Sequence, residues 1–406
     1  MPEKPTDSAP SSYAEAGVDE EREQTAFSRV MRPWLARTEV KSPMVTSITG
    51  LSSGYFATLM HLPPGPPLAL TTDGVGTKIL LAREANRWEP VGVDCVANNV
   101  NDLICVGAVP LALLDYVATD RIDEGVLDEL ARGLFLGAEL AGIAIPGGEI
   151  AQIGAMLADS SGGGPMLDLV GTAIGALPPA EAPSNVAPTQ APEQPDLSAA
   201  AGKVLGTQPA YRQPVDGSAV RPGDVIIGLP SSGLHSNGYS LARHALFAKG
   251  GMTLDESVPG TGRRLVDALL QPTRVYVKAA EALWAAGISP RGMAHISGGG
   301  LLNIARLAAD VSYELDALPA PQEVFALIAK KGQIDAATMY ATFNMGIGYC
   351  IVVSKSEQQA ALDALKSVGE DPVRIGWVTA RPGRSVSIPA AGLYGKGDAF
   401  EQVKGK

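Results

Sequence analysis

Apolar runs alternate with helical patterns along most of the chain, in two blocks separated by a proline-rich segment. The first block, from about residue 66 to 177, contains the strand-like runs PLALTTD, LALLDYVA and LDLVGTAIGAL. The second begins at GDVIIGLP, continues through TFNMGIGYCIVVS and PVRIGWVTA, and ends on SVSIP. Short apolar runs between helices are typical of mixed sheets. The pattern therefore predicts an α/β protein of the α+β type, with two mixed α/β domains.

The domain boundaries follow from changes in composition. Residues 1–12 are rich in proline, serine and charge, which predicts a disordered tail. Between Pro178 and Pro214 the chain holds eight of its 31 prolines and almost no periodic apolar pattern. Residues 179–220 are therefore predicted to be a Pro/Ala-rich insertion and linker. The N-terminal domain is then 13–178, the C-terminal domain is 221–389, and residues 390–406 are expected to be a tail.

Net charge and cysteine content limit which binding partners and which cellular compartments are compatible with the sequence. The formal charge of −11 argues against a nucleic-acid partner, which needs clustered Lys and Arg. A small anionic substrate is compatible if a metal cation masks its charge. The acidic N-terminus lacks the features of a signal peptide and no apolar run reaches 18 residues, so we expect a cytoplasmic protein without membrane contact. Cys95, Cys105 and Cys350 have no ligand-like spacing, which indicates buried free thiols.

A polar stripe runs along one predicted helix. Asp94, Asn98, Asn101 and Asp102 are spaced by four, seven and eight residues, so a helix places them on one face. Short acids and amides are good oxygen ligands for Mg²⁺ but poor solubilising groups. Asp73, at the end of a strand-like run, could face them and complete a site for Mg²⁺ and nucleotide phosphates. The other interpretation, an exposed helix with an asparagine-rich edge, stays open.

The turn DGVGTK after that strand supplies flexible backbone and Lys78. It lacks the GxxxxGK[ST] spacing of a P-loop, so any nucleotide would be held through metal and strand-end chemistry. Lys78 is a candidate phosphate contact, and a solvated lysine beside a turn is the alternative. Two loops of the second block, SSGLHSNGYSL and HISGGG, concentrate hydroxyls, amides and glycines around His235 and His295. Each loop is either a ligand site or a satisfied turn.

Seven motifs occur in an order that identifies a family resemblance. TTDGVGTK, VNDL followed by LDYVAT, PGGE, SSGLHSNGYSL, PTRVYVK, HISGGG and TFNMGIG resemble the phosphoribosylformylglycinamidine cyclo-ligase family, from about Ser12 to Pro389. The resemblance implies an ATP-dependent and Mg²⁺-dependent ring closure in purine biosynthesis. The amide oxygen of formylglycinamidine ribonucleotide is phosphorylated, a neighbouring nitrogen closes the imidazole of aminoimidazole ribonucleotide, and ADP and phosphate leave. It also implies a homodimer whose N-terminal domains form a shared β-barrel.

The resemblance also assigns roles to matched positions. Catalytic candidates are His235, His295 and Asp102, with neither histidine preferred, and metal candidates are Asp73, Asp94 and Asp102. The candidate nucleotide contacts are Asp73, Gly74, Gly76, Thr77, Lys78, Asn101 and Asp102. The candidate substrate contacts are Ser232, Gly233, His235, Ser236, Asn237, Gly148 and Glu149.

Two segments depart from the family pattern. The usual glycine-rich loop is here TGLSSGYFAT, and the usual GGETAEMPG is GGEIAQIGA, with Ile150 and Gln152 in place of Thr and Glu. A catalytically altered or regulatory ATP-binding paralogue is therefore an alternative, and it predicts no ADP release with substrate. Thiamine-phosphate kinase and selenophosphate synthetase are the nearest rivals in the superfamily. The second is disfavoured because no cysteine precedes Cys95, and the first because SSGLHSNGYSL and TFNMGIG occur together.

Overall fold

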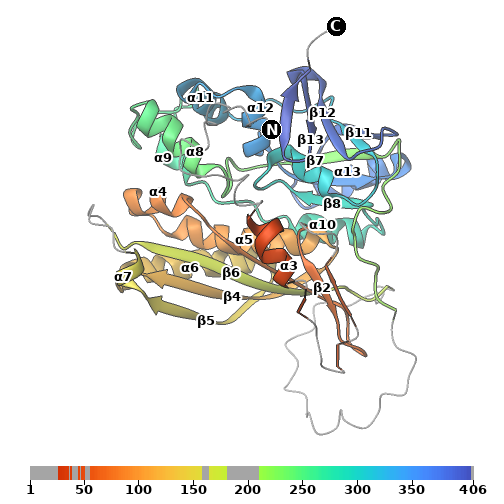
Figure 1. Cartoon of the computed structure of the whole chain (residues 1–406), viewed down its shortest axis with the longest axis horizontal. Helices are drawn as coiled ribbons and strands as arrows, with labels where there is room; N and C mark the ends of the chain where they lie inside the picture. The colour runs from red at the N-terminus through yellow and green to blue at the C-terminus, as the bar shows by residue number, and fades with distance from the viewer. Residues whose placement is uncertain are drawn as a thin grey trace, which may run out of the picture.

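The computed structural model describes residues 26–35, 37–38, 44–45, 47–50, 55–157, 164–180 and 210–403. Two mixed α/β domains lie against each other, each built on its own sheet (Figure 1). The predicted fold class is thereby confirmed. Within the described residues no helix is long and apolar enough to cross a membrane. The sequence also predicts a helix from Asp19 to about Leu35; its first part lies outside the described residues, and its end is helical, as Phe27–Met31 and α3 (Arg32–Leu35).

The N-terminal sheet has six strands in the order β1-β2-β3-β6-β4-β5. All neighbouring strands are antiparallel except β4 and β5, which are parallel. Helices α5 and α6 cover one face of this sheet, and no helix among the described residues covers the other face (Figure 1). The elements are β1 (Ser47–Gly50), β2 (Thr58–His61), β3 (Leu68–Gly74), α4 (Lys78–Ala85), α5 (Glu89–Cys105), β4 (Val109–Thr119), α6 (Glu124–Ala141), β5 (Ala144–Gln152), α7 (Gly154–Leu157) and β6 (Leu167–Ala176).

Helix α5 is the predicted helix with the polar stripe, and it is buried along almost its whole length. Pro90 lies in its first turn, where a missing N–H costs nothing. Glycines let α6 approach it closely: a Cβ at Gly133 would fall 2.0 Å from the Glu89 carbonyl oxygen. The other side of α5 packs on strand β8 and helix α10 of the C-terminal domain. A single helix therefore belongs to the cores of both domains.

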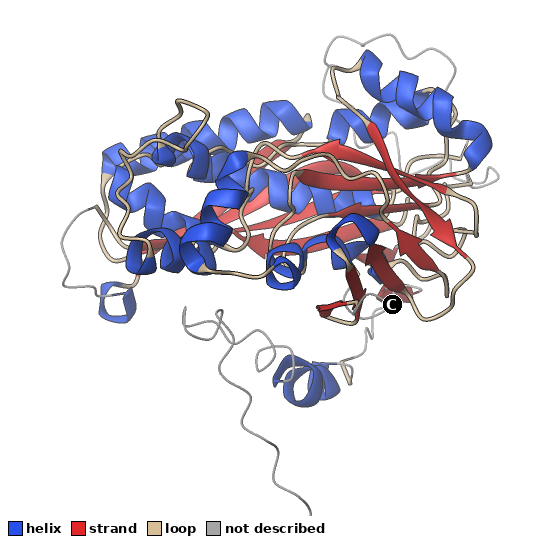
Figure 2. Ribbon diagram, turned by 90° about the horizontal axis from the view of Figure 1, so that it is seen from above, coloured by secondary structure: helices blue, strands red, loops and turns tan. Residues whose placement is uncertain are grey.

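The C-terminal sheet has eight strands in the order β14-β13-β12-β9-β11-β7-β10-β8. Its neighbouring strands are antiparallel except β12 and β9, which are parallel. Figure 2 shows helices distributed around the strands. The elements are β7 (Val225–Pro230), α8 (Tyr239–Arg243), α9 (Leu265–Leu269), α10 (Val277–Ala285), β8 (Gly292–His295), a 3-10 helix (Gly300–Arg306), β9 (Ser312–Glu314), α11 (Glu323–Gly332), α12 (Ala336–Thr342), β10 (Ile347–Val353), α13 (Gln358–Ser367), β11 (Val373–Thr379), β12 (Ser385–Ile388), β13 (Leu393–Lys396) and β14 (Ala399–Gln402).

Two stretches outside the predicted domains have defined structure. The expectation of a tail from residue 390 is wrong for residues 393–402, which form β13 and β14 at the edge of the C-terminal sheet. These strands are short and separated by turns, so they carry little periodic apolar signal. The two ends of the predicted insertion lie together, because Ala180 N donates to the Ala210 carbonyl and Arg212 N to the Pro178 carbonyl.

Candidate active site

The first part of the polar stripe forms a buried cluster, which we call the Lys78–Asp94 cluster. Lys78 and Asp94 are both fully buried, and Lys78 Nζ lies 2.7 Å from Asp94 Oδ2. The ammonium also donates to the carbonyls of His235 and Gln271. Asp94 Oδ1 accepts from the backbone N–H and the hydroxyl of Thr273, both at 2.7 Å. Burial lowers the pKa of Lys78 and Asp94 counteracts this.

This geometry revises two of the sequence assignments. Asp94 was expected to hold a metal ion, but its two oxygens are occupied by Lys78 and Thr273. Lys78 was expected to contact a phosphate or to be solvated, but its ammonium is enclosed by protein groups. Neither alternative interpretation of the stripe holds here, because this end of α5 is neither an exposed edge nor an open cation site. It joins the two domains.

Asn101 strengthens the same junction. Its amide nitrogen donates to the Arg274 carbonyl at 2.8 Å, and its amide oxygen accepts from the Tyr276 N–H at 2.9 Å. The side chain is fully buried, so both of its polar ends are used by the segment PTRVYVK. The structure therefore gives Asn101, expected beside a nucleotide, a connecting position between the domains.

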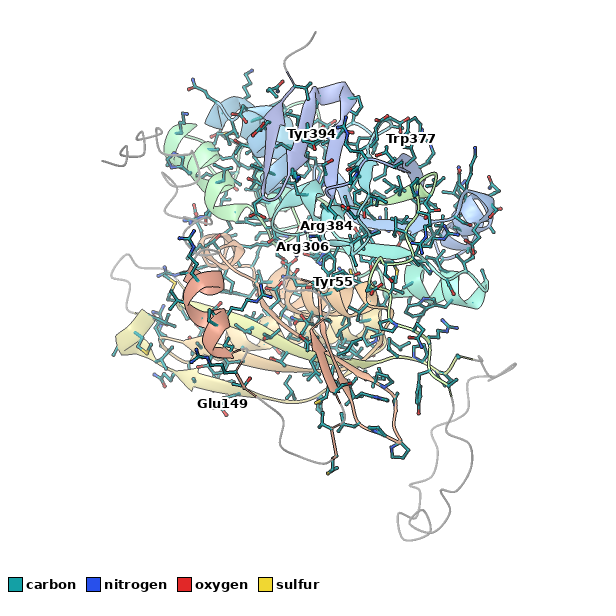
Figure 3. All side chains as sticks on the ribbon, turned by 45° about the vertical axis from the view of Figure 1, so that its right-hand side comes forward. Tyr55, Glu149, Arg306, Trp377, Arg384 and Tyr394 are labelled. Atoms are coloured by element: carbon teal, nitrogen blue, oxygen red, sulfur yellow. The ribbon has the colours of Figure 1, made fainter. Side chains whose placement is uncertain are left out.

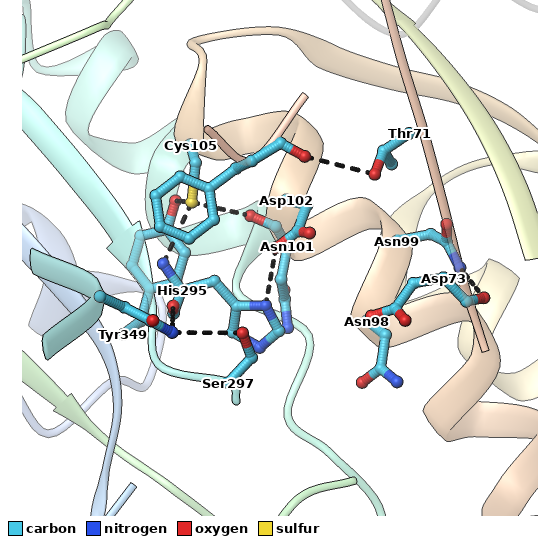
Figure 4. A network of polar contacts seen from close by, with 12 residues as sticks. Thr71, Asp73, Asn98, Asn99, Asn101, Asp102, Cys105, His295, Ser297 and Tyr349 are labelled. Atoms are coloured by element: carbon cyan, nitrogen blue, oxygen red, sulfur yellow. Dashed lines mark hydrogen bonds and ion pairs between the residues drawn. The ribbon is translucent and has the colours of Figure 1, made fainter. Parts of the chain in front are cut away.

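The second part of the stripe is different, because Asp102 remains partly accessible. Its side chain is 16% exposed, and Oδ1 lies 2.9 Å from Nδ1 of His295 (Figure 4). His295 ends strand β8 and is buried. Its Nε2 has no hydrogen-bond partner among the described residues. The carboxylate therefore fixes one side of the ring, and the other nitrogen is buried with its hydrogen-bonding capacity unused.

Asp73 lies near this pair, at the end of β3, and the residue is exposed. Surrounding protein desolvates its carboxylate and the charge of Asp102 repels it, which together raise its pKa to about 6. The interaction with His295 and the hydrogen bond from the Gly74 N–H lower this pKa in turn. Asp73 therefore lies close enough to Asp102 for the charge of Asp102 to contribute to its raised pKa.

Two amides accompany Asp73 (Figure 4). Asn98 donates to the Gly74 carbonyl and Asn99 to the Asp73 carbonyl. The amide oxygens of Asn98 and Asn99 are buried and accept no hydrogen bond from any described residue. No three His, Cys, Asp or Glu side chains in the described ranges are grouped to hold a metal. Two carboxylates and amide oxygens nevertheless fit Mg²⁺, which keeps several waters and takes few protein ligands.

The loop SSGLHSNG lies against the Lys78–Asp94 cluster. His235 is buried in a left-handed conformation, and its Nε2 accepts from the Ser232 N–H at 3.2 Å. Ser236 shares a hydrogen bond with Thr273, and the Gly233 carbonyl accepts from Asn344. Burial and nearby positive charges hold the pKa of His235 well below its usual value. Most polar groups of this loop are therefore satisfied inside the protein.

Other predicted contacts are spread over the molecule. Thr77 and Gly76 are exposed, and the Thr77 hydroxyl lies 3.1 Å from that of Ser240. Gly148 and Glu149 lie on the exposed edge strand β5, and Figure 3 shows Glu149 far from the side chains between the domains. Within one chain, the structure does not bring Gly148 and Glu149 to the HSNG loop.

Sequence reasoning missed a basic pocket beside the Asp102–His295 pair. A cavity of about 610 Å³ is bordered by Arg306, Arg384 and Lys396 together with Gly298 and Gly299. Arg384 and Lys396 escaped attention because they lie in the region interpreted as a last strand and a tail. The left-handed backbone of Arg384, with φ of 50°, leaves no signal in a sequence.

Comparison with known proteins places this site in a family. Residues 55–177 match the model of the AIR synthase related protein N-terminal domain, and residues 221–388 match its C-terminal domain. The chain is 38% identical to a phosphoribosylformylglycinamidine cyclo-ligase of Methanothermobacter thermautotrophicus, over 93% of this chain and 97% of the relative. A relative of the same name from Myxococcus xanthus is also 38% identical, over 93% and 98% of the two chains.

Solved structures share the fold at much lower identity. A structure named AaThiL complexed with AMPPCP and TMP superposes with a TM-score of 0.56 at 16% identity, covering 94% of this chain and 98% of that one. The hydrogenase maturation protein HypE in complex with ATP gives 0.54 at 16% identity, covering 94% and 95%. The matched domains and the full-length relatives together establish that the chain belongs to the phosphoribosylformylglycinamidine cyclo-ligase family.

Proposed function

We propose that this protein catalyses the ATP-dependent cyclisation of formylglycinamidine ribonucleotide to aminoimidazole ribonucleotide, with release of ADP and phosphate, in purine biosynthesis. Membership of the cyclo-ligase family supports the reaction. The observation that carries the proposal is the Asp102–His295 pair, with a free ring nitrogen, beside the accessible carboxylate of Asp73. A ring closure with phosphoryl transfer needs both a proton acceptor and a site for a cation.

Asp73 and Asp102 would hold Mg²⁺, with the amide oxygens of Asn98 and Asn99 as further candidates. When bound, the cation neutralises the charge of the ATP phosphates and of the phosphoryl group in transfer. Desolvation, followed by repulsion from Asp102, raises the pKa of Asp73, and such a cation would oppose both effects. Asp94 and Lys78 are not part of this proposal, because they are paired with each other.

His295 is the residue we propose for proton transfer. The nitrogen that closes the imidazole loses a proton, and Nε2 of His295 is the unpartnered basic atom next to Asp102. Asp102 would accept the hydrogen bond from Nδ1–H and keep the lone pair on Nε2. His235 is less suited, because its Nε2 already accepts from the Ser232 N–H. His235, Ser236 and Asn237 then shape the wall of the site.

We also propose a cytoplasmic homodimer. The face of the N-terminal sheet opposite α5 and α6 exposes large apolar side chains, including Leu114 and Tyr116, which are 50% and 42% exposed. An apolar face of this kind normally meets a partner. A second copy placed there would also bring Gly148 and Glu149 to a subunit boundary. Three buried free thiols are compatible with a reducing compartment.

The test is a product assay with Mg²⁺, ATP and formylglycinamidine ribonucleotide. We expect aminoimidazole ribonucleotide and ADP in equal amounts, and no product without Mg²⁺. ATP binding without ADP formation would instead support the regulatory paralogue. The exposed Ile150, in place of a polar family residue, is the observation that keeps this second candidate in view.

A further inference from the structure

The cavity between the Gly298–Gly299 turn and the C-terminal hairpin holds three cations that the mechanism above does not use. Arg306 comes from the end of the 3-10 helix after β8, Arg384 from the position just before β12, and Lys396 from the end of β13. The remaining lining includes Asn303 and Thr342, which are polar and uncharged. Three chain segments thus place a positively charged side chain each around one cavity of about 610 Å³. This volume suits a small ligand.

These cations lack the counterions that arginines elsewhere in this domain have. Arg374 forms two hydrogen bonds with Asp316, and Arg274 and Arg291 pair with Glu370 and Asp224. Among the described residues, none of Arg306, Arg384 and Lys396 has a carboxylate oxygen within 4.0 Å. Asp398 is the one carboxylate that lines the pocket. The pocket therefore carries an excess of positive charge that an anionic ligand would neutralise.

Local geometry presents these groups to the cavity. Arg384 adopts a left-handed conformation with φ of 50°, and the Gly383 N–H before it is held by Asp310 at 2.6 Å. A Cβ at Gly383 would come within 3.2 Å of Lys396 Nζ, so the glycine leaves room for the ammonium. A non-glycine residue in this region costs free energy, which is often retained where function needs it. Figure 3 shows Arg384 and Arg306 one above the other at the boundary between the domains.

The pocket adjoins the reaction centre. Asn303 lines it and donates to the His295 carbonyl at 3.0 Å. The Arg306 guanidinium lies over the ring of Phe56 and interacts with the charges of both Asp102 and Asp398. Asp73, Asn98 and Asn99 lie together, apart from Asp102 and His295 (Figure 4). The lining includes neither Asp73 nor Asp102, so an anionic ligand in the pocket leaves the proposed cation site free.

We propose that the Arg306–Arg384–Lys396 pocket binds the phosphate monoester of the ribonucleotide substrate. The assignment rests on the proposed function for the identity of the substrate, whereas the anion class follows from the pocket itself. Arginine matches phosphate oxygens with two parallel hydrogen bonds, and lysine adds a point charge. The nucleotide phosphates belong on the carboxylate side, where a cation can accompany them. The last strands of the chain thereby determine substrate affinity.

Binding of ribose 5-phosphate to the full chain, followed by phosphorus NMR titration, tests the anion site without turnover. We expect wild type to bind ribose 5-phosphate but not ribose, Arg384→Gln to weaken binding at least tenfold, and Lys396→Met to weaken it severalfold. Asp398→Asn should tighten binding severalfold, because it removes the opposing charge. Arg381→Gln is the matched control, since Arg381 stacks on Tyr394 and lines a different cavity. No binding by wild type, or equal binding by Arg384→Gln, overturns the proposal.

Steady-state kinetics separate the two possible sources of phosphate. In Arg384→Gln we expect the KM for formylglycinamidine ribonucleotide to rise at least tenfold, with the KM for ATP and kcat within about threefold. A rise in the KM for ATP alone would assign the pocket to the nucleotide and overturn the proposal. If wild type binds ribose 5-phosphate in the pocket but forms no cyclised product, the proposed function fails and the anion site stands. If Arg384→Gln forms the product with unaltered kinetics, the proposed function stands and the phosphate site is overturned.

Discussion

Asp94 and Asp102 lie two turns apart on one face of α5, yet their surroundings are opposite. Asp94 is fully buried and bound by Lys78 and Thr273, which come from both domains. Asp102 is 16% exposed and holds His295 next to a basic pocket. Residue type and spacing therefore do not determine whether a carboxylate is structural or functional. That depends on how many hydrogen-bond and ion-pair partners the protein already supplies to it. A carboxylate whose partners are complete holds the fold together, and one with remaining capacity can bind a ligand.

The largest effect is expected from breaking the buried pair. Asp94→Asn should lower the free energy of unfolding by about 3–5 kcal/mol, because it leaves Lys78 charged and uncompensated in the core. Chemical denaturation measures the loss. Adding Lys78→Met to Asp94→Asn should recover part of it.

The matched control for this prediction is Asp128→Asn, which breaks the exposed pair of Asp128 with Arg132 on α6. We expect a change below about 1 kcal/mol there, since exposed ion pairs contribute little. Equal effects of Asp94→Asn and Asp128→Asn would contradict the structural role given to Asp94.

Removing the other carboxylate should affect turnover and not the fold. Asp102→Asn is expected to lower kcat about 100-fold or more, which corresponds to about 3 kcal/mol of activation free energy. The Tm should stay close to that of wild type, because the side chain reaches solvent and asparagine can keep the hydrogen bond to His295 across the domain boundary. Kinetics and thermal unfolding on the same sample check both parts. Near-normal turnover would remove Asp102 from the proposed mechanism.

A smaller effect is expected from His235, whose carbonyl belongs to the Lys78–Asp94 cluster. Burial, followed by the charges of His295, Lys78 and Arg274, lowers its pKa well below the usual value. The folded ring therefore stays neutral, while the unfolded chain takes up a proton below about pH 6.5. Because the unfolded state then binds more protons, stability falls as the pH decreases from about 6.5 towards the folded-state pKa.

His235→Asn tests this dependence while tolerating the left-handed backbone, which asparagine adopts readily. Between pH 7 and pH 5 the Tm of the variant should fall less than the Tm of wild type. Parallel curves of Tm against pH for wild type and variant would show that another group is responsible.

The smallest effect is expected far from both carboxylates. Replacing residues 181–209 by a two-residue turn should change the Tm by no more than about 2 °C. The flanking backbone is already joined by the Ala180 to Ala210 hydrogen bond, and loop length enters the closure entropy only logarithmically. Thermal unfolding measures the change. A large loss would mean that the deleted segment contributes to the core.

Sequence reasoning was most successful where local periodicity decides structure. The spacing of Asp94, Asn98, Asn101 and Asp102 predicted one helix face, and α5 confirms that face. Periodicity does not report what packs on a face. Thr273 and His295, which distinguish Asp94 from Asp102, are about 180 to 190 residues away in the chain.

The basic pocket could not be predicted from the sequence for a related reason. Arg306, Arg384 and Lys396 come from three separate segments, and the last two lie just before β12 and at the end of β13, both of which are only four residues long. Their convergence depends on the pairing of β12 with both β9 and β13. Strand order in a sheet is a tertiary property that the residues of one strand do not encode alone.

The shared helix also limits how the molecule can open. Rotating one sheet against the other would pull Thr273 and Tyr276 away from α5 and strand Lys78 among apolar groups. The two halves are therefore expected to move as a single rigid body. Entry and exit of ligands would then rely on small local displacements near the glycine-rich turns. If ligand exchange limits turnover, its rate would be set by those displacements and not by a hinge motion of the domains.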